Sequence, residues 1–396
     1  MEFNESFYKD PYKTEFDAEV ISCSPAKKGY ALILSDTLFY PEGGGQSADK
    51  GVIRLSDGGE ISVSDVKRNS RDEVEHYIDT SIPEGTKVHG TIDFDHRFSL
   101  MQNHSGEHIV SGLIHKTYGY ENVGFHMSDV ITIDISGELS WEQAMEIERK
   151  ANAAIWKNLP VNISLPDSET AAASEYRSKK ELSGQIRLVT IDETDCCACC
   201  GLHVKNTGEI GLIKLLSLIN YKGGVRIEMV CGAKALADYE AKQDSNTEIK
   251  NLLSVKPHEV TAAVKHVLEE SNEKSARIAD LSERYSDMRV KELTPEKGII
   301  ISQEENLDGI GIRKLCEKLK NSGKADVSAV LKPLAGGDSF QYVIASTKYD
   351  LKNLAKPLNS ALNGRGGGSK EMIQGTFFSS YDDIVSVIKE TFSGSE

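Results

Sequence analysis

FSLMQNHSGEHIVSGLIHKTY, residues 98–118, is the stretch around which the first half of this 396-residue chain is built. Its apolar positions, among them Met101, Ile109 and Leu113, recur at helical spacing and predict one long helix. Within it, His104 and His108 stand four residues apart and therefore project from the same face of the helix. Two imidazoles on one helical face suit a metal ion.

A second pair repeats this four-residue step: Cys199 and His203 in CCGLH, residues 199–203. Three histidines and one thiolate favour zinc over calcium or magnesium. A pair of helical histidines alone is more often satisfied by the core or by solvent, so the second pair is what favours a metal. The spacing to His203 favours Cys199 as the sulfur ligand, and Cys196, Cys197 and Cys200 remain alternatives. Clustered cysteines of this kind are typical of metal ligands in a reducing compartment.

Working outward, the sequence predicts an α+β protein in four parts. Short apolar runs separated by Gly, Asp and Ser clusters predict a β-rich subdomain, and helices alternating with strands predict a mixed α+β zinc-binding domain. A long helical, coiled-coil-like linker and a small glycine-rich α/β domain follow. The expected boundaries are residues 1–95, 96–235, 236–294 and 295–396.

The linker carries a heptad pattern. Pro257 divides it, and the positions beyond follow alternating steps of four and three: Val260, Val264, Val267, Ser271, Lys274, Ile278, Leu281, Tyr285 and Met288. Such a seam predicts two long helices that fold on each other or pair with a second copy of the chain. We therefore expect a homodimer formed through the linker and the C-terminal domain.

The net charge and the N-terminal segment bear on what the protein binds and where it is located. The net charge of −15 argues mildly against general nucleic-acid binding, although local basic patches can override it. The N-terminus has neither a basic start nor an apolar run, and no stretch approaches the roughly 18 apolar residues of a membrane span. No membrane contact and a cytoplasmic location are therefore expected.

Two basic stretches are where phosphate is expected to bind. One spans residues 205–226, and the other spans residues 351–370, with Lys352, Lys356, Arg365 and Lys370. Within the second, the bare amides of residues 364–368 around the Arg365 guanidinium make an anion cradle. A solvated charged face is the commoner explanation of such runs. The residues expected to contact nucleic acid are Lys214, Lys222, Arg226, Gly364, Arg365, Gly366, Gly367, Gly368 and Lys370.

The segment FYPEGGGQ, residues 39–46, joins a β run to three consecutive glycines. Glycines allow positive φ angles and leave backbone N–H groups unobstructed, so a substrate oxygen can approach the main chain. The alternative is a β-bulge or turn of purely structural use.

Five motifs occur in order along the chain: FYPEGGGQSADKG, HSGEHIVSG, VGFH, ACCGLHVKNTGEIG and KGGVRIEMVCG. Together they resemble the free-standing alanyl-tRNA editing proteins, the AlaX family in its long form, and the editing half of alanyl-tRNA synthetase. Residues 300–394 resemble the glycine-rich C-terminal domain that follows such modules. The resemblance covers nearly the whole chain.

The resemblance implies a deacylase for mischarged tRNA(Ala), cleaving the aminoacyl ester of serine, and also of glycine, at a zinc-containing site. It places the zinc ligands on His104, His108, Cys199 and His203, and the glycine motif on Gly43, Gly44, Gly45 and Gln46. It also matches Thr37 to a threonine that faces the amino-acid pocket. The aminoacylation half of the synthetase is expected to be missing, because the chain begins almost directly at the editing module.

Two positions depart from the family pattern. Ser47 replaces a usual proline, and Leu202 replaces the usual threonine of the CxGTH segment. Leu202 stands between two expected ligands, so its effect is expected on the fine geometry of the site.

The physics of amino-acid recognition also favours a second, hydrolytic selection step. A synthetase pocket rejects an amino acid that merely adds a hydroxyl by only about a hundredfold. An editing pocket can instead select serine over alanine. It can hydrogen-bond the serine hydroxyl through Thr37 or Gln46, and those groups stay unpaired when alanine is bound.

The expected mechanism is attack of zinc-polarised water on the ester, with the amides of Gly43 to Gly45 at the developing oxyanion and Gln46 orienting the substrate. Four protein ligands would close the zinc tetrahedron, so either one ligand yields or the metal only shapes the pocket. Two other function classes are open. One is a non-catalytic tRNA-binding protein with structural zinc, and the other is an HxxEH metallopeptidase with Glu107 as its base.

Overall fold

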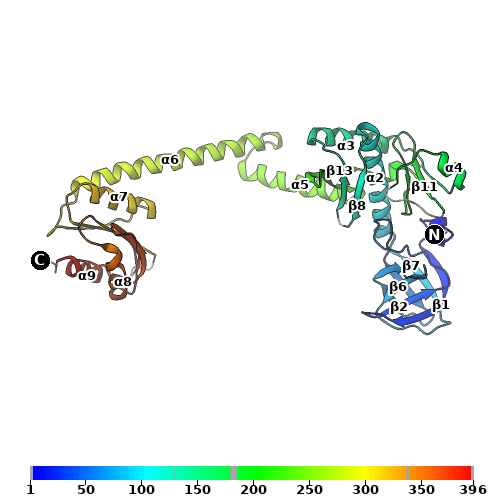
Figure 1. Ribbon diagram of the computed structural model, residues 1–396, viewed down its shortest axis with the longest axis horizontal. Helices are drawn as coiled ribbons and strands as arrows, with labels where there is room; N and C mark the ends of the chain where they lie inside the picture. The colour runs from blue at the N-terminus through cyan, green and yellow to red at the C-terminus, as the bar shows by residue number, and fades with distance from the viewer. Residues whose placement is uncertain (1–2, 129, 179–184, 336–338, 394–396) are drawn as a thin grey trace. The chain divides into compact units, whose positions relative to one another are not determined.

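The computed structural model describes residues 3–128, 130–178, 185–335 and 339–393. The chain forms two compact units, Met1–Thr247 and Glu248–Glu396, each with helices and sheets (Figure 1). The prediction of a mixed α and β chain is therefore confirmed. The four expected domain boundaries stay predictions.

The first sheet of the N-terminal unit has seven strands in the order β4-β3-β7-β1-β2-β6-β5. The strands are β1 (Glu15–Pro25), β2 (Tyr30–Leu34), β3 (Gly51–Leu55), β4 (Glu60–Val63), β5 (Asp65–Arg68), β6 (Val74–Ile78) and β7 (Lys87–Ile92). Every neighbouring pair of strands is antiparallel, and β7 alternates between buried positions and positions that are exposed or partly exposed. One face therefore supplies a core that includes Phe16, Phe39 and Ile53.

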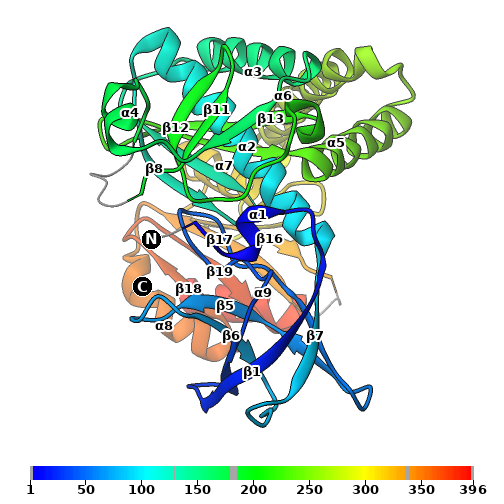
Figure 2. The same cartoon turned by 90° about the vertical axis from the view of Figure 1, so that its right-hand side faces the viewer.

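Helix α2 (Phe94–Tyr118) begins directly after β7 and leads into the second half of the unit (Figures 1 and 2). Asp93 caps its start by accepting a hydrogen bond from the backbone N–H of His96, and Gly119 ends it with φ of 72°. The helix is buried on nearly all sides between Leu100 and Val110. It is therefore a central core helix that fixes its histidines rigidly.

Two further sheets surround α2. A four-stranded sheet has the order β13-β14-β9-β8, and a three-stranded sheet has the order β10-β11-β12. Their strands are β8 (Asn122–Met127), β9 (Ile131–Ile135), β10 (Val161–Ser164), β11 (Leu188–Ile191), β12 (Asp195–Ala198), β13 (Ile213–Tyr221) and β14 (Gly224–Cys231). Before α5, the other helical elements described in the unit are α1 (Ser6–Lys9), α3 (Trp141–Trp156), α4 (Ser168–Ala173) and the 3₁₀ turn η1 (Thr207–Ile210).

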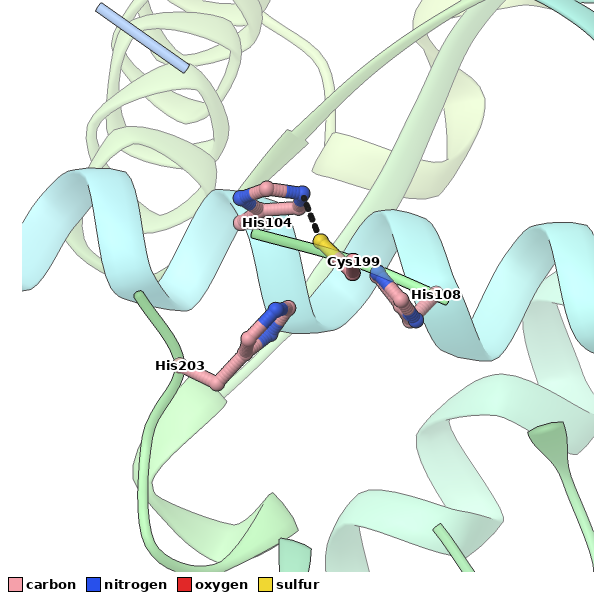
Figure 3. Close-up of side chains that lie close together, drawn as sticks. All are labelled: His104, His108, Cys199 and His203. Carbon is pink, nitrogen blue, oxygen red and sulfur yellow. Dashed lines mark hydrogen bonds between the residues drawn. The ribbon is translucent and has the colours of Figure 1, made fainter. Parts of the chain in front are cut away.

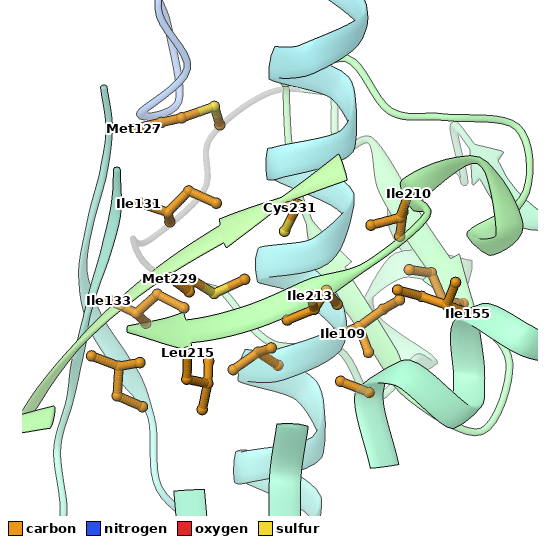
Figure 4. Close-up of a cluster of buried hydrophobic side chains, with 14 of the residues drawn as sticks. Ile109, Met127, Ile131, Ile133, Ile155, Ile210, Ile213, Leu215, Met229 and Cys231 are labelled. Atoms are coloured by element: carbon orange, nitrogen blue, oxygen red, sulfur yellow. The ribbon is translucent and has the colours of Figure 1, made fainter. Parts of the chain in front are cut away.

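Helix α3 is capped at its start, because Ser140 and Gln143 form a reciprocal capping box. Figure 4 shows the core that α2 and α3 make with the four-stranded sheet, with Ile109 of α2 near Ile155 of α3 and Ile213 of β13. This apolar packing holds α2 in place beside the loop that follows β12.

The helical segment contains α5 (Gly232–Leu253), the 3₁₀ turn η2 (Pro257–Glu259) and α6 (Val260–Glu292). The two long helices and the break at Pro257 match the prediction. The apolar seam of α6 is largely exposed, with Val267 at 49%, Ile278 at 65% and Leu281 at 50%. Pairing of this seam with a second chain stays a prediction.

The C-terminal unit is a five-stranded sheet in the order β15-β16-β17-β19-β18, with only β15 and β16 parallel. Its elements are β15 (Ile299–Gln303), α7 (Gly309–Asn321), β16 (Val327–Pro333), β17 (Phe340–Ser346), α8 (Leu351–Ala361), β18 (Arg365–Gly368), β19 (Met372–Phe377) and α9 (Tyr381–Ser393). One face packs on α7, and the other face packs on α8 and α9. The end of α6 joins this unit through Arg289, whose Nε donates to the buried Glu304 at 2.8 Å.

Candidate metal centre

The structure brings the two predicted ligand pairs together. His104 and His108 project from α2, while Cys199 and His203 lie in the loop that follows β12, ninety-five residues on from His104 (Figure 3). Their ligand atoms all lie within 4.8 Å of one another, and Cys199 Sγ is 3.3 Å from His104 Nε2. All three histidines are almost fully buried.

Each imidazole is held from outside the cluster through Nδ1. His104 Nδ1 is 2.9 Å from Gln46 Oε1, His108 Nδ1 is 2.9 Å from Asp195 Oδ2, and His203 Nδ1 is 3.2 Å from Ser105 Oγ. The Nε2 atoms are thereby left to face the centre of the cluster. Metal-binding histidines typically show this arrangement, in which an outer group orients the ring.

The residues present fit a zinc ion. His203 Nε2 is buried and makes no hydrogen bond within the described part of the chain, which is a costly state for a ring nitrogen unless a cation occupies the centre. Imidazole nitrogen and thiolate sulfur are both ligands that zinc prefers, and four such ligands match its usual coordination number. A second group, His108, Asp195 and Cys197, also lies within ligand distance, but the Asp195 carboxylate is already paired with an arginine.

The electrostatics of the site favour a bound cation. Burial raises the pKa of the Cys199 thiol, but His104 and His108 beside it hold that pKa well below its usual value. Burial lowers the pKa of His108, yet Cys199 and Asp195 raise it to about 10. The cluster thus contains a thiolate, which is the form that ligates metal, and an imidazolium that must release its proton to do so.

The glycine motif lies beside this cluster. Gly43 and Gln46 form a two-way backbone bridge around Gly44 and Gly45, whose φ angles are 61° and 86°. Positive φ at both central positions makes a tight turn that only glycine enters easily. Gly43 N–H is committed to Gln46 O, whereas the N–H groups of Gly44 and Gly45 make no backbone hydrogen bond to the described residues.

Gln46 is tied to the metal cluster. Its Oε1 accepts from His104 Nδ1 at 2.9 Å and from the Leu202 backbone N–H at 3.0 Å. Its Nε2 is buried and has no hydrogen-bond partner among the described residues. The sequence suggested a substrate contact for Gln46 and did not anticipate this positioning of His104.

Leu202, the departure from the family pattern, packs into the apolar core and is 1% exposed. Only its backbone contacts the site, through the N–H bond to Gln46. A leucine here therefore adds apolar packing behind the ligand loop and leaves the ligands in place.

Thr37 lies in the core of the N-terminal sheet. Its Oγ1 is 2.8 Å from His76 Nε2 and accepts from the Phe39 backbone N–H at 3.0 Å. His76 Nδ1 lies 2.9 Å from Leu32 O, and burial lowers the pKa of His76 to about 4. His76 is therefore neutral with its proton on Nδ1, so it accepts the hydroxyl proton of Thr37.

Glu107, the acid of the HxxEH pattern, is also buried. Its Oε1 accepts from Ser111 Oγ at 2.6 Å and from Asn122 Nδ2 at 2.5 Å. It does not belong to the four-residue cluster. This arrangement gives the metallopeptidase hypothesis no support.

Several residues that sequence reasoning missed support the ligand loop. The hydroxyls of Tyr8 and Tyr40 both donate to the carbonyl of Cys200, at 2.9 and 3.1 Å. Arg187 donates to the carbonyls on either side of Cys200, at 2.8 and 3.0 Å. Arg177 holds Asp195 through two bonds of 2.7 and 2.9 Å. For these supporting residues the sequence offered one signal, the acidic Asp195 four residues before Cys199.

The predicted basic residues of the first unit are largely neutralised. Lys214 pairs with Glu148 at 2.6 Å, and Arg226 forms a two-bond pair with Asp134 at 2.6 and 2.8 Å. Lys222 sits at the hairpin between β13 and β14, with Nζ 5.0 Å from the centroid of the preceding tyrosine ring. Lys222 is thus the better candidate phosphate contact of the three.

The predicted anion cradle is an edge strand. Arg365, Gly366, Gly367 and Gly368 form β18, whose hydrogen-bonded neighbour is β19, and Gly364 precedes it. Arg365 and Lys370 are exposed. Lys352 and Lys356 of α8 line the same shallow pocket as Arg365. The glycine strand therefore presents backbone beside several cations.

Across the described residues, no helix combines the length and apolarity needed to cross a bilayer.

Two family descriptions match parts of the chain. Residues 186–228 match the threonyl and alanyl tRNA synthetase second additional domain, and residues 4–96 match tRNA synthetases class II (A). The first match covers the Cys199 and His203 loop, and the second covers the glycine motif.

Curated relatives cover more of the chain. It is 29% identical to the alanyl-tRNA editing protein AlaX-L of Pyrococcus horikoshii, over 97% of each chain. It is 31% identical to the alanine–tRNA ligase of Methanopyrus kandleri, covering 93% of this chain and 42% of the ligase. It is 34% identical to the alanyl-tRNA editing protein Aarsd1 of Bos taurus, covering 52% of this chain and 50% of that protein. The chain thus spans nearly all of one editing protein and less than half of the ligase.

Proposed function

We propose that this chain, which belongs to the family of alanyl-tRNA editing proteins, hydrolyses the aminoacyl ester of tRNA(Ala) mischarged with serine, and also with glycine. The observation that carries the proposal is the convergence of three imidazole Nε2 atoms and the Cys199 thiolate beside the glycine turn. The products are the free amino acid and tRNA(Ala) with its terminal hydroxyl restored.

His104, His108, Cys199 and His203 would hold a zinc ion, which when bound supplies a Lewis acid for the ester carbonyl and a means of lowering the pKa of water to about 7. The amides of Gly44 and Gly45 are the chain's donors for the oxygen that gains charge during attack on the ester. These donors are fixed in advance by the turn, so the site needs no rearrangement to offer them.

Gln46 has a second use besides holding His104. Its buried Nε2 is a donor with no hydrogen-bond partner in the part of the chain that the structure describes, which supports a role in binding a substrate oxygen. Thr37 is proposed as the acceptor for the serine hydroxyl on the strength of the family pattern. Its hydroxyl proton is already given to His76, so one oxygen lone pair is what it offers.

The test is a deacylation assay on the purified, zinc-loaded protein with Ser-tRNA(Ala), Gly-tRNA(Ala) and Ala-tRNA(Ala). We expect the first two to be hydrolysed well above the spontaneous rate and the third to be spared. Ser-tRNA(Ser) is the control for tRNA identity. Ser-tRNA(Ala) that decays only at the spontaneous rate would contradict the proposal.

A second candidate is a non-catalytic tRNA-binding protein, favoured by the fact that four protein ligands fill a zinc tetrahedron. Retained zinc and tight tRNA(Ala) binding without deacylation would establish it.

We propose that the C-terminal unit binds the tRNA backbone through β18, the exposed guanidinium of Arg365 and the lysines of α8. Homodimer formation through the exposed seam of α6 is part of the same proposal. Gly364, Gly366, Gly367, Gly368 and Lys370 complete the proposed surface.

Replacing Arg365 by alanine is expected to weaken tRNA(Ala) binding moderately and to reduce the slope of log affinity against log salt by about 1, because one phosphate contact is lost. Fluorescence anisotropy with labelled tRNA at several salt concentrations measures both. The matched control is Arg277→Ala, which removes the same charge from exposed α6. Equal slopes for the two variants would remove Arg365 from the interface.

A further inference from the structure

The three candidate histidine ligands are held by outer groups of different chemistry. His108 faces a carboxylate, His104 faces an amide oxygen, and His203 faces a hydroxyl. The outer group fixes which ring nitrogen carries the proton and strengthens the ligand. These differences in the outer group rank the three histidines by how firmly each ring is held.

His108 is the most firmly held. Asp195 can only accept a hydrogen bond, so His108 Nδ1 must be the donor, and the proton that His108 gives up on binding metal is the one on Nε2, which faces the cluster. Asp195 is itself fixed by two bonds from Arg177, and both side chains are buried. The whole chain of contacts is therefore rigid.

His104 is also fixed in one tautomer. The Gln46 atom that contacts it also accepts from the Leu202 backbone N–H, which can only donate, so this atom is the amide oxygen. His104 Nδ1 must then be the donor. Its Nε2 lies 3.3 Å from Cys199 Sγ, which itself accepts from the Gly201 backbone N–H at 3.3 Å.

His203 has the weakest support. Among the described residues, the Ser105 hydroxyl is the one hydrogen-bond contact of His203 outside the cluster, at 3.2 Å, and a hydroxyl can donate or accept. The partner therefore does not fix the tautomer of His203. Ser105 Oγ also accepts from the Val204 backbone N–H at 3.2 Å, so it is shared between two groups.

The backbone of the ligand loop is held on both sides of His203. Carbonyls of residues 199–201 are held by Tyr8, Tyr40 and Arg187, and the N–H of Leu202 is held by Gln46. Beyond His203, Val204 N–H donates to the shared Ser105 hydroxyl, and Lys205 N–H donates to Tyr12 Oη at 2.9 Å. The difference between the histidines therefore lies in the outer contacts of their side chains.

We infer that the metal ligands form a permanent set of His104, His108 and Cys199, and that His203 is the exchangeable ligand. This rests on the proposed metal site. It resolves the conflict between four protein ligands and hydrolytic chemistry, because a site with three permanent ligands keeps one position that a small molecule can take. Asp195 and Arg177 are positioning residues for His108.

The first test compares zinc affinity in variants of the outer groups, measured by competition with a chromophoric chelator on metal-depleted protein. Asp195→Asn is expected to weaken zinc binding by about 10- to 100-fold, the usual effect of losing an outer-shell carboxylate. Ser105→Ala is expected to change it less than about 3-fold, because its bond to His203 contributes little to the ligand set. Equal losses in the two variants would overturn the ranking.

The second test removes the ligands themselves. His203→Ala is expected to keep one zinc per chain, whereas His108→Ala is expected to lose it under the same dialysis. Circular dichroism at equal protein concentration checks that both variants are folded. Zinc loss from His203→Ala as complete as that from His108→Ala would overturn the inference.

A third measurement needs no variant. The wild-type protein loaded with Co²⁺ is titrated with azide while the visible spectrum is recorded. A saturable spectral change is expected if His203 yields its position, and an unchanged spectrum at all azide concentrations would overturn the inference. These outcomes are separate from the proposed hydrolysis, because a protein that binds zinc but does not deacylate tRNA still gives a ligand ranking, whereas failure of the wild type to bind zinc removes the metal site itself.

Discussion

Replacing Cys199 by alanine is expected to abolish retention of zinc and to slow deacylation of Ser-tRNA(Ala) by at least about a hundredfold. The change removes the thiolate of the cluster, and with it the negative charge that the buried imidazoles of His104 and His108 stabilise. The remaining donors are three neutral imidazoles, which hold zinc more weakly than a set containing a thiolate. Metal content by elemental analysis and single-turnover deacylation measure the two effects.

Cys196→Ala is the matched control. Cys196 lies three residues earlier, is partly exposed, and its thiol contacts Thr190 Oγ1 at 3.4 Å. We expect near wild-type zinc content and rate from this variant. Full activity and one bound zinc in Cys199→Ala would show that the cluster is not the hydrolytic centre.

Replacing Gly201 by alanine is the second large expected effect, because the chain leaves no room for a Cβ there. An ideal Cβ would lie 2.0 Å from His104 Cε1, 2.2 Å from His104 Nδ1 and 3.0 Å from Gln46 Oε1. Neither neighbour can yield cheaply, since His104 Nδ1 and Gln46 Oε1 are bonded to each other. The ring of His104 must therefore turn out of its ligand position, or the loop must move.

We expect Gly201→Ala to lose zinc affinity by more than about a hundredfold and deacylation in proportion, with about 1 to 3 kcal/mol lost from the free energy of unfolding through overpacking. Chelator competition and urea denaturation give the two numbers. Gly59→Ala is the control, since its nearest contacts are 3.2 and 3.7 Å and its backbone N–H to Asp57 is kept. Unchanged zinc affinity in Gly201→Ala would show that the loop relaxes freely.

The ligand set illustrates what the sequence alone can predict. Both pairs use a four-residue step, but the rule that such a step places side chains on one face applies only to helices, so it explains His104 and His108. Cys199 and His203 lie in a loop, where the step has no fixed geometry. Their meeting with α2 depends on packing between β12 and α2, which residue spacing does not encode.

The outer groups were not accessible to sequence reasoning for a similar reason. Gln46, Asp195 and Arg177 reach the cluster through contacts that span 58, 87 and 18 residues along the chain. No local pattern announces such contacts. The glycine triplet was recognised as a place where backbone is bare, yet its tight turn and the commitment of Gly43 N–H follow only from the structure.

The basic patch of residues 205–226 shows what a count of charges along the sequence leaves out. Counting charges along the sequence found one acid among several cations, but Lys214 and Arg226 find their acids on other elements, Glu148 of α3 and Asp134 of β9. A cation paired across a sheet is poorly placed to attract phosphate. A count of charges along the sequence therefore overestimates nucleic-acid binding unless the acidic residues on neighbouring elements are also known.

The contact from Tyr8 to the Cys200 carbonyl has a practical consequence for anyone producing this protein. A hydroxyl in the first ten residues supports a loop that lies 192 positions further along the chain. A shortened form that lacks Tyr8 would lose this support for the loop, although the two residues are far apart in the sequence.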